Sequence, residues 1–421
     1  MSHATSNLQK IKIRIETLPW GLGTRLAKPL YRATLRASHQ ALVWLYTPIA
    51  VSFWLAGIRV PDFLFKHIGH LMLEPDCYLK EQLLQHRKLR PTWMVPVRGQ
   101  PANQAAMRYW STYFTVINDP FWIKLLRPLA YHPLTRYQTS RYTTATPTAA
   151  DCYPIGTAWG TRPPLLSITA ADEDRGRSAL VRFGLTDIDW YVCVHNRESG
   201  HANQDPAKEE HLHSHRNMPV NAFVLAIEYI VSQGGTCFRM GDPTMRPAPQ
   251  IPGLIDYARS PHRADWLDLY LSANCRFFLG SNSGAMLMAT TFGRPVAAVN
   301  MSPLTSIPCG IHDLYTPALY RRASSGHLMT FAEIVDSPTA NIRTTVDFAA
   351  YDIELVANTP EDIRDLATEQ LQRVLGRYVH EEANEKRQDR FQSLFKPGHH
   401  CYGGSARIGD AFLERYEALL N

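Results

Sequence analysis

The chain has 421 residues, of which 19% are charged and 45% are hydrophobic. This length is too great for one compact core and the composition excludes a mainly disordered protein, so we expect two globular domains. Residues 1–40 carry seven Lys and Arg residues against one acid, Glu16, which accounts for the whole formal net charge of +6. The neutral remainder argues against a nucleic-acid-binding protein and indicates a basic amino-terminal arm.

Cysteine usage indicates a reducing compartment. The seven cysteines are scattered and form no CxxC pair, so we expect free thiols in a cytoplasmic protein: Cys77, Cys152, Cys193, Cys237, Cys275, Cys309 and Cys401. The first residues also lack the basic and then apolar pattern of a secretory signal peptide.

Residues 41–58 contain no charged side chain. Eighteen residues lie at the lower limit for crossing a bilayer, and a span with the arm in the cytosol would put the rest of the chain outside. Two other interpretations are favoured. In one, helices carrying Trp44, Tyr46 and Trp54 lie peripherally on the cytoplasmic face of the inner membrane, with the arm on anionic lipid. In the other, the segment is a helix buried against the first domain.

Residues 59–169 are predicted to form the first α/β domain. Its expected strands are 60–66, 93–97 and 115–117, and its expected helices are 71–86, 103–114 and 121–129. Residues 132–168 show no clear period, which favours loops and an acceptor-side surface.

Residues 170–400 are predicted to form the second domain, joined by a helix that Thr169 caps and that ends at Gly184. Strands and helices alternate in this domain, which predicts a parallel, doubly wound sheet with its ligand at the carboxyl ends of the strands. The expected strands are 190–195, 236–240, 254–257, 277–279 and 296–299, and the expected helices are 222–232, 264–275, 285–292 and 359–390. A last helix, 408–420, lies in a terminal segment, 401–421.

The turn between residues 280 and 284 is the most informative stretch. It contains two serines and two glycines between a buried strand and a short helix that Gly293 ends. Free main-chain N–H groups at such a turn favour an anion, whereas a plain strand–helix connection would not need this composition.

Residues 276–300 also carry a family resemblance, through Ser281, Ser283, Gly284, Gly293 and Pro295. The stretch resembles the nucleotide-sugar diphosphate loop of GT-B glycosyltransferases, and of heptosyltransferases in particular, with Asn282 in place of their aspartate. From about Arg59 onward the chain resembles a little-characterised family of bacterial surface-polysaccharide, or capsule, glycosyltransferases. The resemblance implies two Rossmann-like domains facing a central cleft, an N-terminal helical, basic extension, and a last helix that crosses back to the first domain.

His195-x-Arg197 follows the first strand of the second domain and resembles a motif of inverting fucosyltransferase-like enzymes, in which the arginine holds the donor diphosphate. A guanidinium can hold two phosphate oxygens at once. The predicted diphosphate-binding residues are therefore Arg197, His195, Ser281, Asn282, Ser283 and Gly284. An interdomain ion pair of Arg197, with Glu198 beside it, is the alternative.

Three further residues are predicted to contact the nucleotide or the sugar: Arg239, Asp242 and Asp268. Asp242 follows a strand and could accept ribose or sugar hydroxyls. Arg239 lies within that strand and could instead pair with an acid, and Asp268 could be an ordinary solvated helix position.

The catalytic base is expected near the first strand-to-helix turn of the first domain. An inverting transfer needs a group that deprotonates the acceptor hydroxyl. Glu74 and His70 are the preferred candidates, and Asp76 is the third. The alternative for Glu74 is stabilisation of the first turn of a helix.

The sequence favours a metal-independent enzyme without a cofactor. His201, His211, His213 and His215 alternate in a loop without an evident scaffold for a metal. The Asp-x-Asp strings at 172–174 and 187–189 do not follow a strand, which argues against a catalytic metal site there.

These features together predict a GT-B glycosyltransferase of bacterial surface-polysaccharide biosynthesis. Its partners would be a nucleotide-diphosphate sugar donor, a glycan or polyprenyl-linked acceptor and anionic membrane lipid, and not nucleic acid. A nucleotide-sugar 2-epimerase-like enzyme and a non-catalytic nucleotide-sugar-binding protein are the alternatives.

Overall fold

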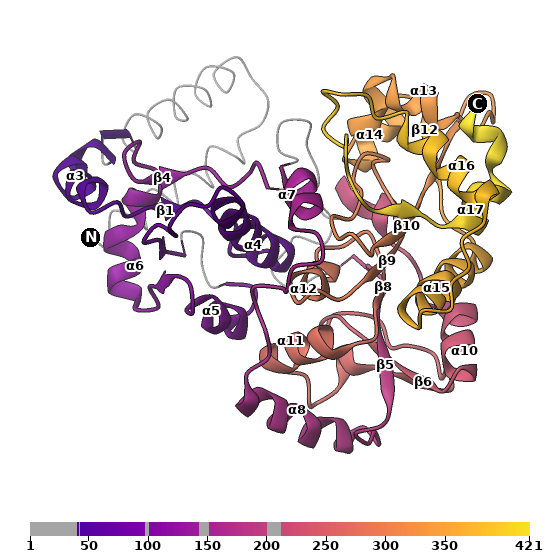
Figure 1. Ribbon diagram of the computed structural model, residues 1–421, viewed down its shortest axis with the longest axis horizontal. Coiled ribbons are helices and arrows are strands. Elements are labelled where there is room, and N and C mark those ends of the chain that lie inside the picture. Colours follow the sequence, from indigo (N-terminus) through magenta and orange to yellow (C-terminus); the bar gives the residue numbers. More distant parts are fainter. Residues whose placement is uncertain (1–39, 42, 97–100, 143–150, 200–211) are drawn as a thin grey trace, which may run out of the picture. The chain divides into compact units, whose positions relative to one another are not determined.

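The computed structural model describes residues 40–41, 43–96, 101–142, 151–199 and 212–421, and the basic arm lies outside them (Figure 1). The chain forms two compact units. The smaller unit comprises residues 1–62, 90–97 and 117–137, and the larger one residues 63–89, 98–116 and 138–421. The boundaries of these two compact units therefore differ from the predicted domain boundaries at residues 58, 169 and 400. The assignment of acceptor and donor domains stays a prediction.

The strands are β1 (Val60–Pro61), β2 (Trp93–Met94), β3 (Thr115–Val116), β4 (Arg136–Tyr137), β5 (Trp190–His195), β6 (Gly235–Arg239), β7 (Leu254–Ile255), β8 (Phe278–Ser281), β9 (Val296–Met301), β10 (Leu314–Pro317), β11 (Leu319–Arg322), β12 (Ile353–Val356) and β13 (Arg407–Ile408).

The α-helices are α3 (Thr47–Leu55), α4 (Ile68–Leu84), α5 (Gln104–Trp110), α6 (Pro120–Leu126), α7 (Cys152–Trp159), α8 (Ala170–Arg182), α10 (Val224–Ser232), α11 (Asp265–Asn274), α12 (Met286–Thr291), α13 (Phe331–Val335), α14 (Thr345–Ala350), α15 (Pro360–Val374), α16 (Glu382–Gln392) and α17 (Asp410–Arg415). Short 3₁₀ helices are η1 (Arg127–Ala130), η2 (Ser214–Arg216), η3 (Val220–Phe223), η4 (Tyr257–Arg259), η5 (Pro338–Asn341) and η6 (Glu417–Leu420).

The smaller unit has a short apolar core. Strands β1 and β4 pair in parallel, and Ala50 of α3 is fully buried in a cluster with Val60 and Leu129. The same segment also carries large apolar side chains that are exposed, with Trp44 and Trp54 close to 60% accessible. Residues 41–58 thus combine a buried edge with an exposed apolar surface. In the described part of the chain, no helix is both long and apolar enough to cross a bilayer.

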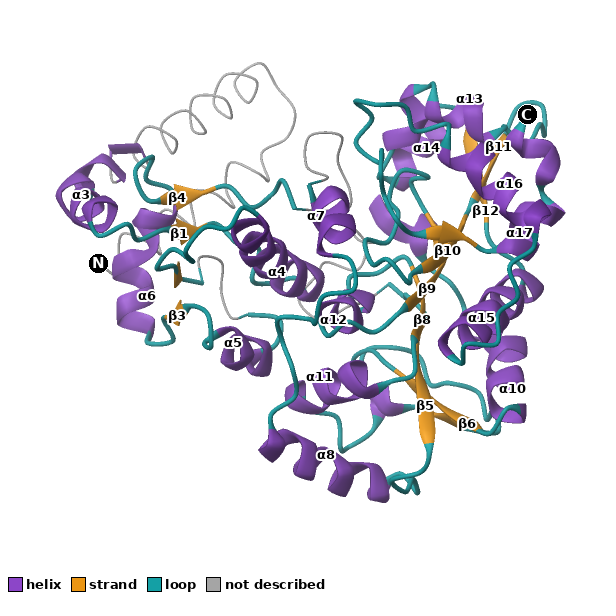
Figure 2. Cartoon of the chain, viewed as in Figure 1, coloured by secondary structure: helices purple, strands orange, loops and turns teal. Residues whose placement is uncertain are grey.

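The larger unit is built on a seven-stranded parallel sheet in the order β13-β10-β9-β8-β5-β6-β7. Helices cover both faces, with α11 and α12 on one side of β5 and β8 and α10 and α15 on the other (Figure 2). Side chains of the second pair of helices pack on the strands in one apolar core, which includes Val192, Ile227, Ile363, Leu366 and Leu371. A mixed α/β architecture with a large parallel sheet, as predicted, is therefore present.

Strand β5 has the predicted bounds, 190–195, and the helix caps also agree with the sequence. Thr359 and Asp362 form a reciprocal capping box at α15, and Thr169 accepts a hydrogen bond from the Asp172 N–H at α8. The predicted helix 359–390 is wrong as one element, because α15 ends at Val374 and a new helix, α16, begins at Glu382. Gly376 takes a φ of +67° there, a conformation that glycine adopts readily.

Two regions contain helices or strands that the hydrophobic periodicity of the sequence did not predict. Helix α7 lies within residues 132–168, which were predicted as loop. Residues 301–358, for which no element was predicted, contribute β10 to the parallel sheet and the antiparallel pair β11–β12. These short elements give too few residues for a hydrophobic period.

Gly176 sets the distance between α8 and α11. A Cβ atom at this position would lie 2.1 Å from the ring of Tyr270. We therefore expect Gly176→Ala to lower the free energy of unfolding by about 1–3 kcal/mol through overpacking, measured by urea denaturation. Ser178→Ala, on the exposed side of the same helix, is the control, with an expected change within about 0.5 kcal/mol. An unchanged midpoint for Gly176→Ala would contradict this packing.

Candidate functional site

The serine-rich turn and the His195-x-Arg197 segment meet at the carboxyl edge of the parallel sheet. His195 pairs in register with Gly280 on the neighbouring strand. Directly beyond, the main-chain N–H of Arg197 donates to the Ser281 hydroxyl at 2.8 Å. Parallel strands end at the same edge, so the two segments that the sequence singled out become neighbours although more than eighty residues separate them.

The side chains of the turn are largely engaged within the protein. Asn282 is buried, and its amide donates to the Ser302 carbonyl oxygen. The Ser283 hydroxyl accepts a hydrogen bond of 3.3 Å from the Ala285 N–H. The turn therefore has a fixed shape, and Asn282 holds it to the segment that follows β9.

A contact between two glycines joins this turn to α4. A Cβ atom on Gly69 would lie 2.8 Å from the Gly284 Cα, and one on Gly284 would lie 3.0 Å from the Gly69 backbone. No other residue type fits at either position without a backbone shift. The first turn of α4 therefore touches the serine-rich turn, and both belong to the larger unit.

His70 and Glu74, the predicted catalytic pair, lie one helical turn apart beside this contact. His70 Nδ1 is 2.7 Å from Glu74 Oε1. The other carboxylate oxygen of Glu74 accepts hydrogen bonds from the Leu64 N–H and the Thr139 hydroxyl. Glu74 is fully buried whereas the His70 side chain is 33% accessible. The carboxylate can orient the imidazole, and the imidazole is the group that can reach a substrate.

The alternative interpretation was that Glu74 stabilises the first turn of a helix, and the position of the helix start contradicts it. The predicted helix began at residue 71, which would put Glu74 in the first turn. The helix begins at Ile68, so Glu74 lies in its second turn and its carboxylate is used for the contacts above. Asp76, the third candidate base, is buried and pairs with Lys80 at 2.6 Å.

Arg197 and His195 are held from both sides of the sheet edge. One nitrogen of the Arg197 guanidinium donates to the His213 carbonyl at 3.1 Å and to the Asn217 side chain. His195 is buried, with Nδ1 2.9 Å from the Met240 carbonyl. Hydrogen bonds of Arg197 thus reach the serine-rich turn through its main chain and η2 through its side chain.

Arg239 forms internal ion pairs instead of the predicted contact with a nucleotide or sugar. Its side chain is fully buried. It donates to Asn196 and Glu198 at 2.8 Å each and to Asp256 at 3.1 Å. A guanidinium whose donors are used in this way stabilises the interior of the unit, which is the pairing that the sequence left open.

Asp268, the third residue predicted to contact the nucleotide or the sugar, is directed inward as well. It accepts hydrogen bonds from the Tyr257 hydroxyl at 2.8 Å and from Arg263 at 2.7 Å. Burial raises its pKa to about 7. Asp242 lies at the end of β6, where its carboxylate accepts from the N–H and the hydroxyl of Thr244.

Sequence reasoning missed Arg216 and Arg343, which lie with His213 and His215 in the larger unit. Burial lowers the pKa of both arginines, for Arg216 to about 10. Arg216 directly follows the last histidine of the histidine-rich loop, and this position was the signal in the sequence that could have identified it. His201 and His211 of that loop lie outside the described residues.

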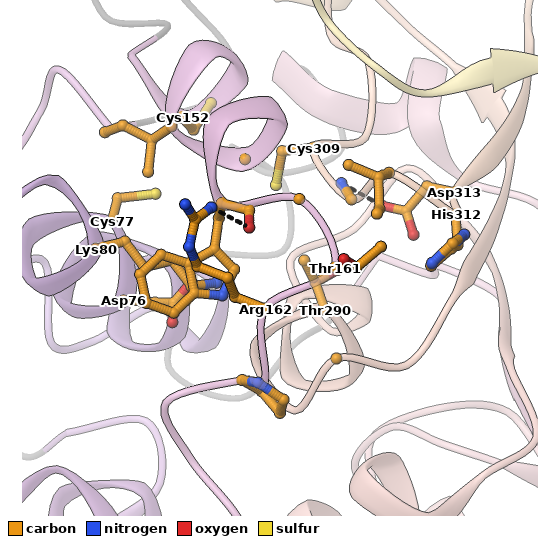
Figure 3. Close-up of a pocket in the computed structure, with 18 of the residues that line it drawn as sticks. Asp76, Cys77, Lys80, Cys152, Thr161, Arg162, Thr290, Cys309, His312 and Asp313 are labelled. Carbon is orange, nitrogen blue, oxygen red and sulfur yellow. Dashed lines mark hydrogen bonds and ion pairs between the residues drawn. The ribbon is translucent and has the colours of Figure 1, made fainter. Parts of the chain in front are cut away.

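A separate cavity of about 280 Å³ lies between α4, α7 and residues 309–313 (Figure 3). Asp76 and Lys80 of α4 line one side, and His312 and Asp313 line another. Burial raises the pKa of Asp313 to about 6, and its carboxylate accepts hydrogen bonds from two main-chain N–H groups. Neither His70 nor the serine-rich turn lines this cavity.

Within the described residues, one group could supply three metal ligands. The ligand atoms of His399, His400 and Cys401 lie within 4.8 Å of one another. The Cys401 thiol donates to the Thr305 carbonyl, and the Cys401 N–H donates to His399 Nδ1. The predicted metal independence stays a prediction.

No known family model and no curated protein matches the chain. Several solved structures show a distant likeness. A family 9 glycosyltransferase from Veillonella parvula is 13% identical over 62% of this chain and 85% of its own, with a TM-score of 0.37. Heptosyltransferase II from E. coli is 14% identical over 62% and 89%, also at 0.37. The E. coli heptosyltransferase WaaC with ADP is 10% identical over 62% and 90%, at 0.34. The distant likeness to heptosyltransferases that the sequence indicated is therefore present.

The glycine contact can be tested without any ligand. Gly69→Ala forces a Cβ against the Gly284 backbone, so we expect a loss of about 1–3 kcal/mol in the free energy of unfolding, measured by urea denaturation. Lys66→Ala, exposed just before the helix, should change it by less than about 0.5 kcal/mol. Equal midpoints for the two variants would exclude the contact.

Proposed function

We propose that the protein is a glycosyltransferase that moves a sugar from a nucleotide-diphosphate donor to a hydroxyl of a glycan or lipid-linked acceptor in bacterial surface-polysaccharide biosynthesis. The Gly69–Gly284 contact is the observation that carries the proposal. It puts a histidine–carboxylate pair next to a turn whose composition suits a diphosphate, at the carboxyl edge of a parallel sheet. Transfer of a glycosyl group needs these two functions side by side.

In the proposed reaction, the oxygen of the acceptor hydroxyl attacks the anomeric carbon of the donor sugar. His70 accepts the proton of that hydroxyl in the same step. Glu74 fixes the orientation of the ring and stabilises the imidazolium that forms. The bond from the anomeric carbon to the diphosphate breaks in the same displacement, so the configuration inverts. Main-chain N–H groups of the serine-rich turn and the Arg197 guanidinium stabilise the departing diphosphate. No metal ion or other cofactor takes part in this proposal.

The test measures nucleotide release from a panel of GDP-, UDP-, ADP- and CMP-sugars, with and without a chelator. Loss of a positioned base lowers turnover by roughly 10²–10⁴-fold. We therefore expect His70→Asn and Glu74→Gln to lower kcat by about that factor while nucleotide affinity is kept. His86→Asn is the matched control, because His86 is exposed at the end of α4 with a φ of +52°, which asparagine tolerates.

Each other outcome has a definite meaning. Full turnover in both variants would exclude the base assignment. A 2-epimer formed from the donor alone would indicate an epimerase. Thermal stabilisation by nucleotide without any product would indicate a binding protein. A chelator that abolishes turnover would contradict metal independence.

We also propose peripheral contact of the smaller unit with anionic membrane lipid. The exposed aromatic side chains Trp44 and Trp54, with Leu45 and Leu55, form an apolar surface on the segment that follows the basic arm. Such a surface favours the interface of a bilayer, and the arm favours its negative charge.

Sedimentation with phosphatidylserine-containing vesicles tests this contact. The double variant Trp44→Ser, Trp54→Ser should bind roughly tenfold or more weakly, since burying one such side chain contributes about 1.5–3 kcal/mol. Ile188→Ser removes a side chain of the larger unit that is 91% accessible and should leave vesicle binding unchanged. Equal binding of all three proteins would exclude this surface as the lipid contact.

A further inference from the structure

Four basic side chains gather in the larger unit, and none of them has an acidic partner among the described residues. We call His213, His215, Arg216 and Arg343 the cationic cluster. The first three belong to η2 or directly precede it, and Arg343 lies between η5 and α14. The centroids of the His213 and His215 rings are 6.4 Å apart. The main-chain N–H and the ring of His215 both contact the Thr345 hydroxyl, at 3.2 and 3.0 Å. The cluster is therefore a packed arrangement of two segments more than 120 residues apart.

The described residues supply no negative charge to compensate the cluster. Among the residues that the structure describes, no aspartate or glutamate pairs with Arg216 or Arg343. Burial lowers the pKa of Arg343, and the charge of Arg216 lowers it further. Burial and Arg216 also lower the pKa of His213 to about 4 and of His215 to about 3. At neutral pH, the cluster consists of two partly buried guanidinium ions beside two neutral imidazoles.

Three nitrogen atoms of the cluster also have no hydrogen-bond partner within the described part of the chain. They are His213 Nδ1, His215 Nε2 and Arg216 Nε, and all three are out of contact with solvent. An unmatched buried donor is destabilising, and an unmatched buried charge is more so. Arg239, elsewhere in the same unit, shows the usual solution, since acids and amides surround it. Burying these atoms without partners is therefore unfavourable until an additional group satisfies them.

The chemistry of the cluster selects an anion over a metal ion. Neutral imidazoles can bind a metal, but two guanidinium ions nearby repel one, and His215 Nδ1 is already paired with Thr345. In the tautomer whose Nδ1 accepts from the Thr345 hydroxyl, His215 presents an N–H at Nε2. His213 gains a donor at Nδ1 on protonation, which a bound anion favours. Two guanidinium ions match a group with two negative charges better than a single carboxylate.

We propose that the cationic cluster binds a phosphate group in its dianionic form. This phosphate site is an addition to the proposed transfer reaction. Its binding can be measured without a sugar and without turnover. The phosphate has two possible sources. Arg197 connects η2 with the serine-rich turn, so the group could belong to the donor diphosphate. It could also be the phosphate of a second molecule, such as a lipid-linked acceptor, bound at the same time.

The experiment is calorimetric titration of the full chain with inorganic phosphate, pyrophosphate and the nucleoside diphosphates. We expect the wild-type protein to bind phosphate or pyrophosphate, and Arg343→Gln and Arg216→Gln to weaken that binding roughly tenfold or more each. Arg177→Gln, which removes an exposed arginine paired with Glu173, is the matched control and should bind as the wild type does. Failure of both anions to bind, or equal binding in all variants, would overturn the proposal.

Two additional measurements separate the sources and exclude misfolding. If the site takes the donor diphosphate, a nucleoside diphosphate competes with pyrophosphate and depends on Arg343. If it takes a second molecule, inorganic phosphate still binds, with the same dependence on Arg343, when nucleoside diphosphate is saturating. Removing an uncompensated charge should not lower the thermal midpoint of the ligand-free protein. A large drop in Arg343→Gln would instead assign the arginine a structural role and contradict the proposal.

Discussion

The contact between Gly69 and Gly284 is the constraint on which the candidate site depends. Two backbones approach each other without any intervening side chain, so the first turn of α4 and the turn after β8 share a boundary. The position of His70 follows from this contact, because the imidazole is one residue beyond Gly69 on a regular helix. Glu74 then follows from helical geometry, since residues four apart lie on the same face. A larger residue at either glycine would separate the histidine–carboxylate pair from the serine-rich turn.

Arginines that are fully or partly buried in the larger unit fall into two kinds, and the difference has a physical meaning. Arg239 is fully buried, and acceptors from Asn196, Glu198 and Asp256 satisfy its donors. Such a residue contributes to the stability of the unit and has little capacity for a ligand. Arg216 and Arg343 lack acidic partners in the described chain. Their cationic charge is therefore available to an external anion, which would compensate for the loss of hydration.

Much of the sheet could be predicted because each strand there carries a local signal. The apolar run at 190–195 and the run before the serine-rich turn both became central strands, and Thr359 with Asp362 marked the start of a helix correctly. Residues 301–358 were not predicted because their strands have about four residues each and pair with distant segments. Short strands of this kind are stabilised by their neighbours in the sheet. They are too short for an alternation of apolar and polar residues to identify them as strands.

The sequence by itself determined which residue types stand at the strand ends. A serine-rich turn, a His-x-Arg segment and a histidine four residues before a glutamate are all local patterns, and each implies a chemistry through its side chains alone. Only the tertiary structure decided which polar side chains are held by internal partners. Arg239 and Asp268 were as polar in the sequence as Arg197, but internal partners hold them in the interior. Arg216 and Arg343 gave little signal, because an uncompensated charge is a property of the surroundings in space.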